Sequence, residues 1–174
     1  MARLPIITLP DPLLRQPSAA IERVDPELQR LIDDMLETMY AAPGVGLAAV
    51  QVGVPRRLLV LDVSGENEPK SPICVINPEI LALGLEANVR EEGCLSIPDV
   101  RFDVERPASL VVRYIDRLGQ TQEISAEGLL ATVIQHEVDH LNGKLIIDYL
   151  SRLKRDIIVR RFKKQGRGER EVVA

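Results

Sequence analysis

The only two histidines of the chain lie in one short window, His136-Glu137-Val138-Asp139-His140. Residues four apart on a helix share a face, one turn apart, so both imidazoles can direct a ring nitrogen at a single divalent metal ion. Glu137 is rotated off that line but stays close enough to take a proton from a water on the metal. This H-E-x-x-H arrangement is typical of metal hydrolases. The sequence therefore predicts a metal-dependent hydrolytic site on a helix.

A catalytic metal site also needs a third protein ligand and an open position. The longer H-E-x-x-H-x-x-G-x-x-H pattern begins with Gly143 but fails at Ile146, which stands where its third histidine would be. Cys94 is the better candidate, because a thiolate is a strong ligand for borderline and soft metals. The other possible ligands are downstream carboxylates, namely Asp148, Asp156, Glu169 and Glu171. The last two lie in a charged tail, where a rigid site is unfavourable.

The composition describes a soluble, globular chain. Its 174 residues, of which 45% are hydrophobic, suffice for one domain with a real core. No apolar run is long enough to cross a bilayer, and the first residues lack the pattern of a secretion signal. We therefore expect a cytoplasmic protein with no membrane partner, in which Cys74 and Cys94 are thiols or metal ligands, not a disulfide. Cys74 lies within an apolar strand and is best explained as a core residue.

The charge is unevenly distributed. From residue 152 to the end there are nine Lys or Arg and three Asp or Glu, a local charge of +6 in a chain whose net charge is −4. A basic tail on an acidic body indicates contact with something anionic, although a solvated helix with a frayed end explains it equally well. We expect one catalytic domain over residues 1–174, with 152–174 as a basic C-terminal helix and tail, and no specific DNA binding.

Apolar spacing and turn residues predict the elements that must position these residues. Asp25-Pro26 starts an N-terminal helix that Pro43-Gly44 ends. Five short segments rich in Val, Ile and Leu are expected to be strands: 57–63, 73–77, 101–104, 109–116 and 121–124. Leu118-Gly119-Gln120 is typical of a hairpin turn, and the short connections leave no room for crossover helices, so the sheets should be antiparallel or mixed.

The metal helix is expected to begin at the cap Ser125 and to end at Asn142-Gly143. It carries apolar stripes on both sides, which is the pattern of a buried helix. The last helix should span 151–165 and turn Leu153, Ile157, Ile158 and Phe162 inward. The predicted fold class is α+β, with antiparallel or mixed sheets surrounding the central H-E-x-x-H helix between an N-terminal and a C-terminal helix.

Three segments, taken together and in this order, resemble the peptide deformylase family. They are Gly44-Val45-Gly46-Leu47-Ala48-Ala49-Val50-Gln51, Glu92-Gly93-Cys94-Leu95-Ser96 and Gln135-His136-Glu137-Val138-Asp139-His140-Leu141. The likeness extends over nearly the whole chain, and the basic C-terminal helix looks like that of bacterial members. One departure is Val50, where many members have proline. It supplies no chemistry, so we expect little effect.

The resemblance implies that the chain removes formate from the N-formyl-methionine of nascent polypeptides. It implies that Cys94, His136 and His140 hold one divalent metal ion, expected to be Fe²⁺ although Zn²⁺, Ni²⁺ or Co²⁺ also suit the ligands. A water on this metal would be the nucleophile, and Glu137 the general base and acid. Gln51 and the backbone N–H of Leu95 would bind the developing oxyanion. The basic helix would dock on the ribosome.

The same resemblance implies a binding site for the methionine side chain and the peptide backbone. Its residues would be Val45, Gly46, Arg101, Leu129, Thr132 and Val133. For Arg101, a surface charge on a strand is an equally good explanation. Two other functions stay open from the motif alone: a metallopeptidase that cleaves internal peptide bonds, and a non-catalytic protein with a structural metal.

Overall fold

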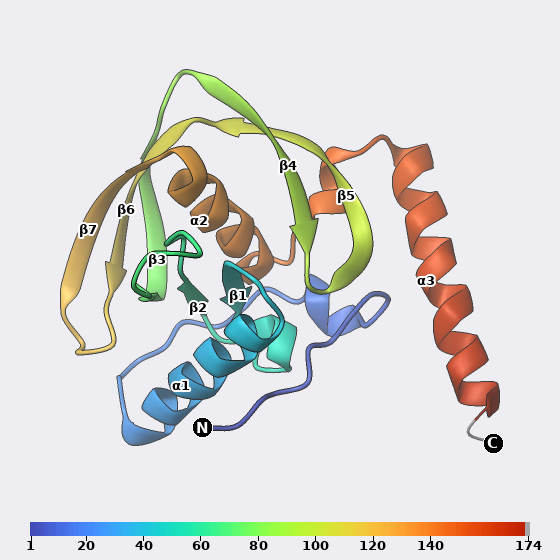
Figure 1. The fold of residues 1–174 in the computed structure, drawn as a ribbon, viewed down its shortest axis with the longest axis horizontal. Helices are drawn as coiled ribbons and strands as arrows, with labels where there is room; N and C mark the ends of the chain where they lie inside the picture. Colours follow the sequence, from blue (N-terminus) through green and yellow to red (C-terminus); the bar gives the residue numbers. More distant parts are fainter. Residues whose placement is uncertain (173–174) are drawn as a thin grey trace.

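The computed structural model describes the backbone of residues 1–172 and the side chains of residues 1–166. Two antiparallel sheets surround one central helix, α2 (Gly128–Leu141), as Figure 1 shows. The five-stranded sheet has the order β1-β2-β3-β6-β7, and β4 and β5 form a second, two-stranded sheet. The predicted α+β class and the central position of the motif helix are confirmed.

The strands and the remaining helices follow one another with short connections. The strands are β1 (Gly46–Ala48), β2 (Leu58–Leu61), β3 (Ile73–Leu83), β4 (Ala87–Cys94), β5 (Ile97–Pro107), β6 (Ser109–Ile115) and β7 (Thr121–Glu127). The other helices are α1 (Pro26–Ala41), α3 (Arg152–Val172) and the 3-10 turns η1 (Pro12–Arg15), η2 (Ala49–Val52) and η3 (Ile146–Tyr149). The predicted Asp25 cap of α1 is confirmed, since its carboxylate accepts the Leu28 N–H at 2.9 Å.

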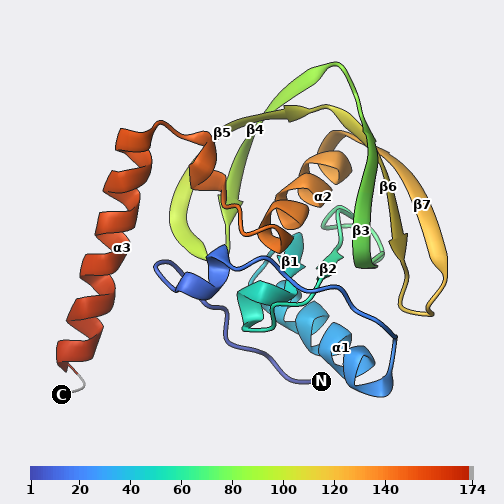
Figure 2. The same ribbon diagram turned by 180° about the vertical axis from the view of Figure 1, so that it is seen from behind.

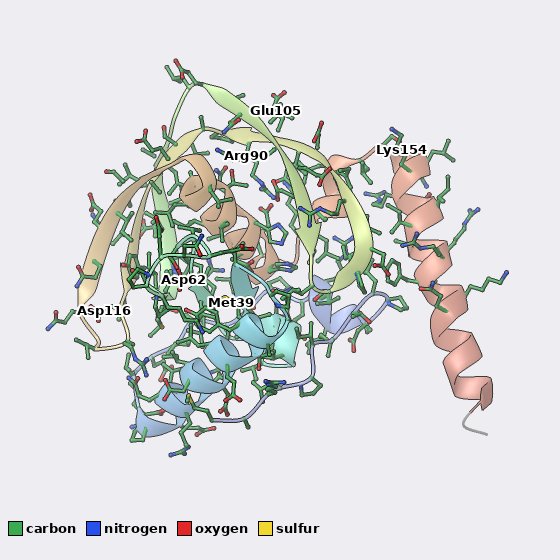
Figure 3. All side chains as sticks on the ribbon, in the orientation of Figure 1. Met39, Asp62, Arg90, Glu105, Asp116 and Lys154 are labelled. Atoms are coloured by element: carbon green, nitrogen blue, oxygen red, sulfur yellow. The ribbon has the colours of Figure 1, made fainter. Side chains whose placement is uncertain are left out.

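Strand β2 lies between two helices, which explains why all four of its residues are apolar and buried. Successive strand side chains point to opposite faces. Leu59 and Leu61 pack in the cluster that contains α2, whereas Leu58 and Val60 pack with Met35 and Met39 of α1. Figure 3 shows Met39 between α1 and the sheet. The α2 helix is thereby held against one face of the sheet at a fixed depth.

The start of α2 differs from the prediction. Ser125 does not cap the helix, because it is a residue of β7 that pairs with Val111 of β6. The strand continues to Glu127, and Gly128, with a φ of +60°, makes the sharp turn into the helix. The predicted stop at Asn142-Gly143 is confirmed, with Gly143 at a φ of +74°. Both histidines thus lie in the last turns of a helix that begins later than expected.

Two strands were not predicted, and three predicted strands are longer. The missing ones are β1 and β4. The extended ones are β3, β5 and β7, which run beyond 73–77, 101–104 and 121–124. β4 is largely exposed, so charged residues replace the apolar alternation that a half-buried strand would show. β5 does alternate, with Val100, Val104 and Arg106 buried, but the alternation extends beyond the predicted segment. Asn77, with a φ of +50°, interrupts the apolar pattern of β3 without ending the strand.

The C-terminal helix α3 stands at the side of the body, next to β5 in Figures 1 and 2. It extends to Val172, beyond the predicted end at 165. The prediction that Leu153 and Ile157 pack inward was wrong, because they are 73% and 57% exposed. Phe162 is buried, with Ile158 packed beside it. Within the described residues no helix is both long and apolar enough to cross a membrane.

Candidate metal centre and cleft

Three side chains with metal-binding atoms meet at the C-terminal end of β4. Cys94 is the last residue of that strand, and His136 and His140 lie one turn apart on α2. One ligand atom from each lies within 4.8 Å of the other two, and Cys94 Sγ is 3.3 Å from His140 Nε2. A soft thiolate and two imidazoles in this proximity fit a divalent transition metal. Both cysteines are free thiols, as predicted.

The alternative third ligands lie elsewhere. The Asp148 carboxylate is held by the guanidinium of Arg15, with the Arg15 Nη2 to Asp148 Oδ1 distance at 3.0 Å. Asp156 lies on α3, and its side chain is 45% exposed beside two arginines. The side chains of Glu169 and Glu171 lie outside the described residues. Cys94 is therefore the only one of the described candidates that reaches both histidines.

His136 is held from behind by a buried ion pair. Its Nδ1 lies 2.9 Å from Oε1 of Glu92, whose carboxylate also accepts two hydrogen bonds from Arg106, at 2.7 and 3.0 Å. Burial alone would raise the pKa of Glu92, but the hydrogen bonds from His136 and Arg106 outweigh it and lower that pKa. Glu92 thus stays a carboxylate, fixes the His136 ring and leaves Nε2 directed at the metal-binding side.

The support of His136 by Glu92 and Arg106 was not predicted from the sequence. Glu92 lies two residues before Cys94 on β4, so both side chains point to the same face of the strand, and that spacing was a usable signal. Asp139 lies 2.8 Å from Nη1 of Arg106 and is three residues after His136, on a neighbouring position of the helix. No local pattern in the sequence indicates that Arg106 belongs to the site, because its position depends on the pairing of β4 with β5.

Glu137 lies beside the ligands, and its side chain is almost completely buried. It is 4% exposed, and Oε2 has no hydrogen-bond partner among the described residues. Gly46 of β1 packs against it so closely that a Cβ there would lie 2.5 Å from Oε1. Burial raises the pKa of Glu137 to about 7. A cation at the site would lower that pKa and favour the carboxylate, which can take a proton from water and then return it.

Gln51 is also fixed at the site. It is 2% exposed, although its sequence neighbourhood permits a surface position. Its side-chain carbonyl accepts the Ala48 N–H at 2.9 Å, which leaves the amide nitrogen to face Ser96 Oγ at 3.1 Å and Cys94 Sγ at 3.7 Å. The side-chain N–H groups therefore point toward the thiol. Leu95 follows Cys94 in the tight turn between β4 and β5.

The site opens into one cleft of about 840 Å³. All the residues predicted to act on the substrate line it, together with two of the three ligands: Val45, Gly46, Gln51, Cys94, Leu95, Arg101, Leu129, Thr132, Val133, His136 and Glu137. His140 lies deeper and is 1% exposed. Thr132 and Val133 are buried in the wall, whereas Val45 and Leu129 are partly exposed at the mouth. Arg101 is an exposed residue whose Nε contacts Glu91 at 2.9 Å.

Fold and site together define a class: a metal-dependent hydrolase with an H-E-x-x-H helix enclosed by antiparallel sheets. A family model described as polypeptide deformylase matches residues 3–156. The peptide deformylase of Rhizobium meliloti (strain 1021) is 60% identical over 163 residues, which cover 94% of each chain. That of Agrobacterium fabrum is 60% identical over 95% of this chain and 97% of its own.

Solved structures agree. The crystal structure of peptide deformylase from Ehrlichia chaffeensis matches with a TM-score of 0.90 at 42% identity, over 97% of this chain and 99% of that one. A structure of the class I type b enzyme from Acinetobacter baumannii, with Met-Ala-Ser bound, has a TM-score of 0.81 at 34% identity, over 86% of this chain and 99% of that one. The chain therefore belongs to the polypeptide deformylase family, whose enzymes remove the formyl group from N-formylmethionine.

Proposed function

We propose that this chain deformylates N-formylmethionyl peptides with Cys94, His136 and His140 as metal ligands and Glu137 as the acid–base group. The observation that carries the proposal is the approach of three ligand atoms to within 4.8 Å of one another, beside a buried carboxyl and at the floor of a cleft. Three protein ligands leave a coordination position open, as in catalytic sites, whereas structural sites usually have four.

The ligand set suits Fe²⁺, which we propose as the native metal, and also Zn²⁺, Ni²⁺ or Co²⁺. Such an ion supplies Lewis acidity and makes a water acidic enough to attack an amide at neutral pH. Burial lowers the pKa of His140 well below its ordinary value, so its imidazole is neutral, the form that binds a metal. The Glu92 carboxylate accepts from His136 Nδ1 and thereby fixes the ring for coordination.

Glu137 has two tasks in this proposal. Its unpaired oxygen takes the proton released as water attacks the formyl carbon, and it returns that proton to the leaving amine, which is a poor leaving group until protonated. The Gln51 amide N–H and the Leu95 backbone N–H would donate to the formyl oxygen as charge builds there. Removing one such donor typically costs about 10² to 10³ in rate.

The cleft supports a substrate that begins with methionine. Thr132 and Val133 lie on α2 one turn before His136 and Leu129 lies two turns before it, and Val45 lines the same cleft, so an apolar side chain can lie next to the metal. Gly46 and Arg101 would contact the peptide backbone. The Met-Ala-Ser found in the Acinetobacter baumannii structure is consistent with such a site.

We further propose that residues 1–174 act as one catalytic domain in the cytoplasm, on nascent chains at the ribosome. The basic surface of α3 supports this, because Arg160, Lys163 and Lys164 are exposed and ribosomal RNA is anionic. The alternative function, cleavage of internal peptide bonds, is not favoured, since the relatives and structures reported above are all peptide deformylases.

Formate release from formyl-Met-Ala tests the function directly. The metal-loaded chain should release formate from this peptide and leave the internal bonds of a longer formylated peptide intact. Acetyl-Met-Ala serves as the control substrate, since its larger acyl group makes the same amide bond. Internal cleavage without formate release would support the metallopeptidase and contradict the proposal.

A further inference from the structure

A chain of polar contacts runs from η3 to Nδ1 of His136, the ring nitrogen that faces away from the metal-binding side. Tyr149 Oη lies 2.8 Å from Asp139 Oδ2 and 2.9 Å from Arg106 Nη1, and Arg106 binds Glu92, which binds His136. We propose that Tyr149 is a positioning residue for the metal centre, which acts through Arg106 and Glu92 on His136. The inference rests on the ligand assignment proposed above.

Arg106 needs such a partner because its guanidinium is buried. Its side chain is 3% exposed, and it faces the carboxylates of Glu92 and Asp139, with side-chain exposures of 6% and 19%. Nη1 lies within 2.9 Å of both Asp139 Oδ2 and Tyr149 Oη. The hydroxyl can accept from the guanidinium and donate to the carboxylate, which closes a ring of three charge-assisted hydrogen bonds. Without the hydroxyl, Arg106 keeps its charge but loses one constraint on its orientation.

Tyr149 itself is fixed by residues outside the metal helix. Lys144 Nζ lies 4.0 Å and Arg106 Cζ 4.7 Å from the centre of its ring, so two cations pack on the aromatic face. The adjacent Asp148 is held by Arg15 of η1. Since Tyr149 is 38% exposed and does not line the cleft, core packing and substrate contact do not account for its place. Tyr149 therefore acts on the site through its hydroxyl group, which contacts Arg106 and Asp139.

The consequence concerns metal retention. Ligands that hydrogen-bond to outer residues keep their orientation, and loss of such residues typically weakens metal binding about 10- to 100-fold. Tyr149 is further removed, so we expect a smaller effect from Tyr149→Phe, about 5- to 10-fold faster metal release. The KM for formyl-Met-Ala should stay unchanged, because no contact with the cleft is lost.

Tyr40 provides a matched control. Its hydroxyl lies 2.6 Å from Asp62 Oδ2, and Lys70 Nζ lies 3.9 Å from the centre of its ring, so Tyr40→Phe removes the same kind of hydrogen bond at a place remote from the ligands. The parent, Tyr149→Phe, Tyr40→Phe and Cys94→Ala are loaded with Co²⁺. Metal release to excess EDTA is followed by the thiolate-to-cobalt absorption band, or by released cobalt for Cys94→Ala, which lacks the thiolate. Thermal unfolding of each loaded variant checks that it is folded.

The expected order of release is Cys94→Ala fastest, then Tyr149→Phe, with Tyr40→Phe within twofold of the parent. Parent-like release from Tyr149→Phe, or equal acceleration in both tyrosine variants, would overturn the role of Tyr149 while leaving the proposed function intact. A Cys94→Ala variant that held Co²⁺ as tightly as the parent would overturn the ligand assignment, and this inference with it.

Discussion

At the scale of residues, the site depends on three buried groups whose neighbours fix what they can do. The desolvated Glu137 carboxyl has an oxygen without a hydrogen-bond partner among residues 1–166, Glu92 is kept ionised by His136 and Arg106, and the Gln51 amide is oriented by the Ala48 N–H. A carboxyl in an apolar position exchanges protons near neutrality, whereas one that accepts charged hydrogen bonds does not. Two glutamates of the same site therefore have different tasks.

The Glu137→Gln variant separates catalysis from metal binding. The amide matches the carboxyl in shape but cannot accept the proton, and general acid–base catalysis typically contributes about 10² to 10⁴ in rate. We expect formate release to fall at least 100-fold while the metal content, measured by atomic emission, equals that of the parent. Turnover within tenfold of the parent with full metal content would remove Glu137 from its proposed role.

At the scale of elements, β1 and α2 must approach closely for the Glu137 side chain to be buried. Gly46 is the first residue of β1, and the space a side chain would take there is filled by Glu137. The sequence suggested a different use for this glycine, close approach of the substrate backbone. Its packing against Glu137 is an additional reason why a residue without a side chain stands here.

The Gly46→Ala variant tests that packing. The new methyl group would lie 2.5 Å from Glu137 Oε1 and must displace it, and a displacement of about 1 Å at an active site can cost about 100-fold in rate. We expect kcat for formyl-Met-Ala to fall about 10- to 100-fold with little change in metal content. Gly65→Ala is the control, because its nearest neighbour atom would be 3.5 Å away. Equal activities of the two variants would show that the contact is not needed.

Local signals in the sequence predicted some of these elements and not others. The Asp25 cap of α1 and the stop of α2 were predictable, since capping depends on a few adjacent residues. The motif fixed His136 and His140, and a thiolate supplied the third candidate. The support of His136 by Arg106 was not predictable, because it depends on the β4–β5 register and on a contact with η3, both of which are non-local.

At the scale of the whole molecule, the site is assembled where the two sheets meet. The N-terminal segment holds them together: the Ile7 N–H donates to the Gln51 carbonyl at 2.8 Å, and the Leu9 N–H donates to the Ser96 carbonyl at 2.9 Å. It thus ties η2, which follows β1 of the larger sheet, to the turn between β4 and β5 of the smaller sheet. Beside this segment α3 presents charge, with Lys154 labelled in Figure 3.

Charge reversal on α3 tests ribosome docking without loss of the buried Phe162 contact. Combined Arg160→Glu, Lys163→Glu and Lys164→Glu substitutions should weaken cosedimentation with ribosomes about tenfold or more, because phosphate contacts by basic residues dominate such binding. Turnover of free formyl-Met-Ala should stay within twofold of the parent. The control reverses three exposed arginines of the body, Arg3, Arg23 and Arg30. Equal loss of binding in both variants would indicate a general charge effect and contradict docking by α3.

X-ray absorption at the metal edge of the zinc-loaded protein tests the central claim most directly, because it reports which atoms surround the ion. The account predicts one sulfur at about 2.3 Å and two imidazole nitrogens at about 2.0 to 2.1 Å, with the sulfur lost in Cys94→Ala. A zinc ion bound without sulfur in the parent, or with the sulfur retained in Cys94→Ala, would contradict it.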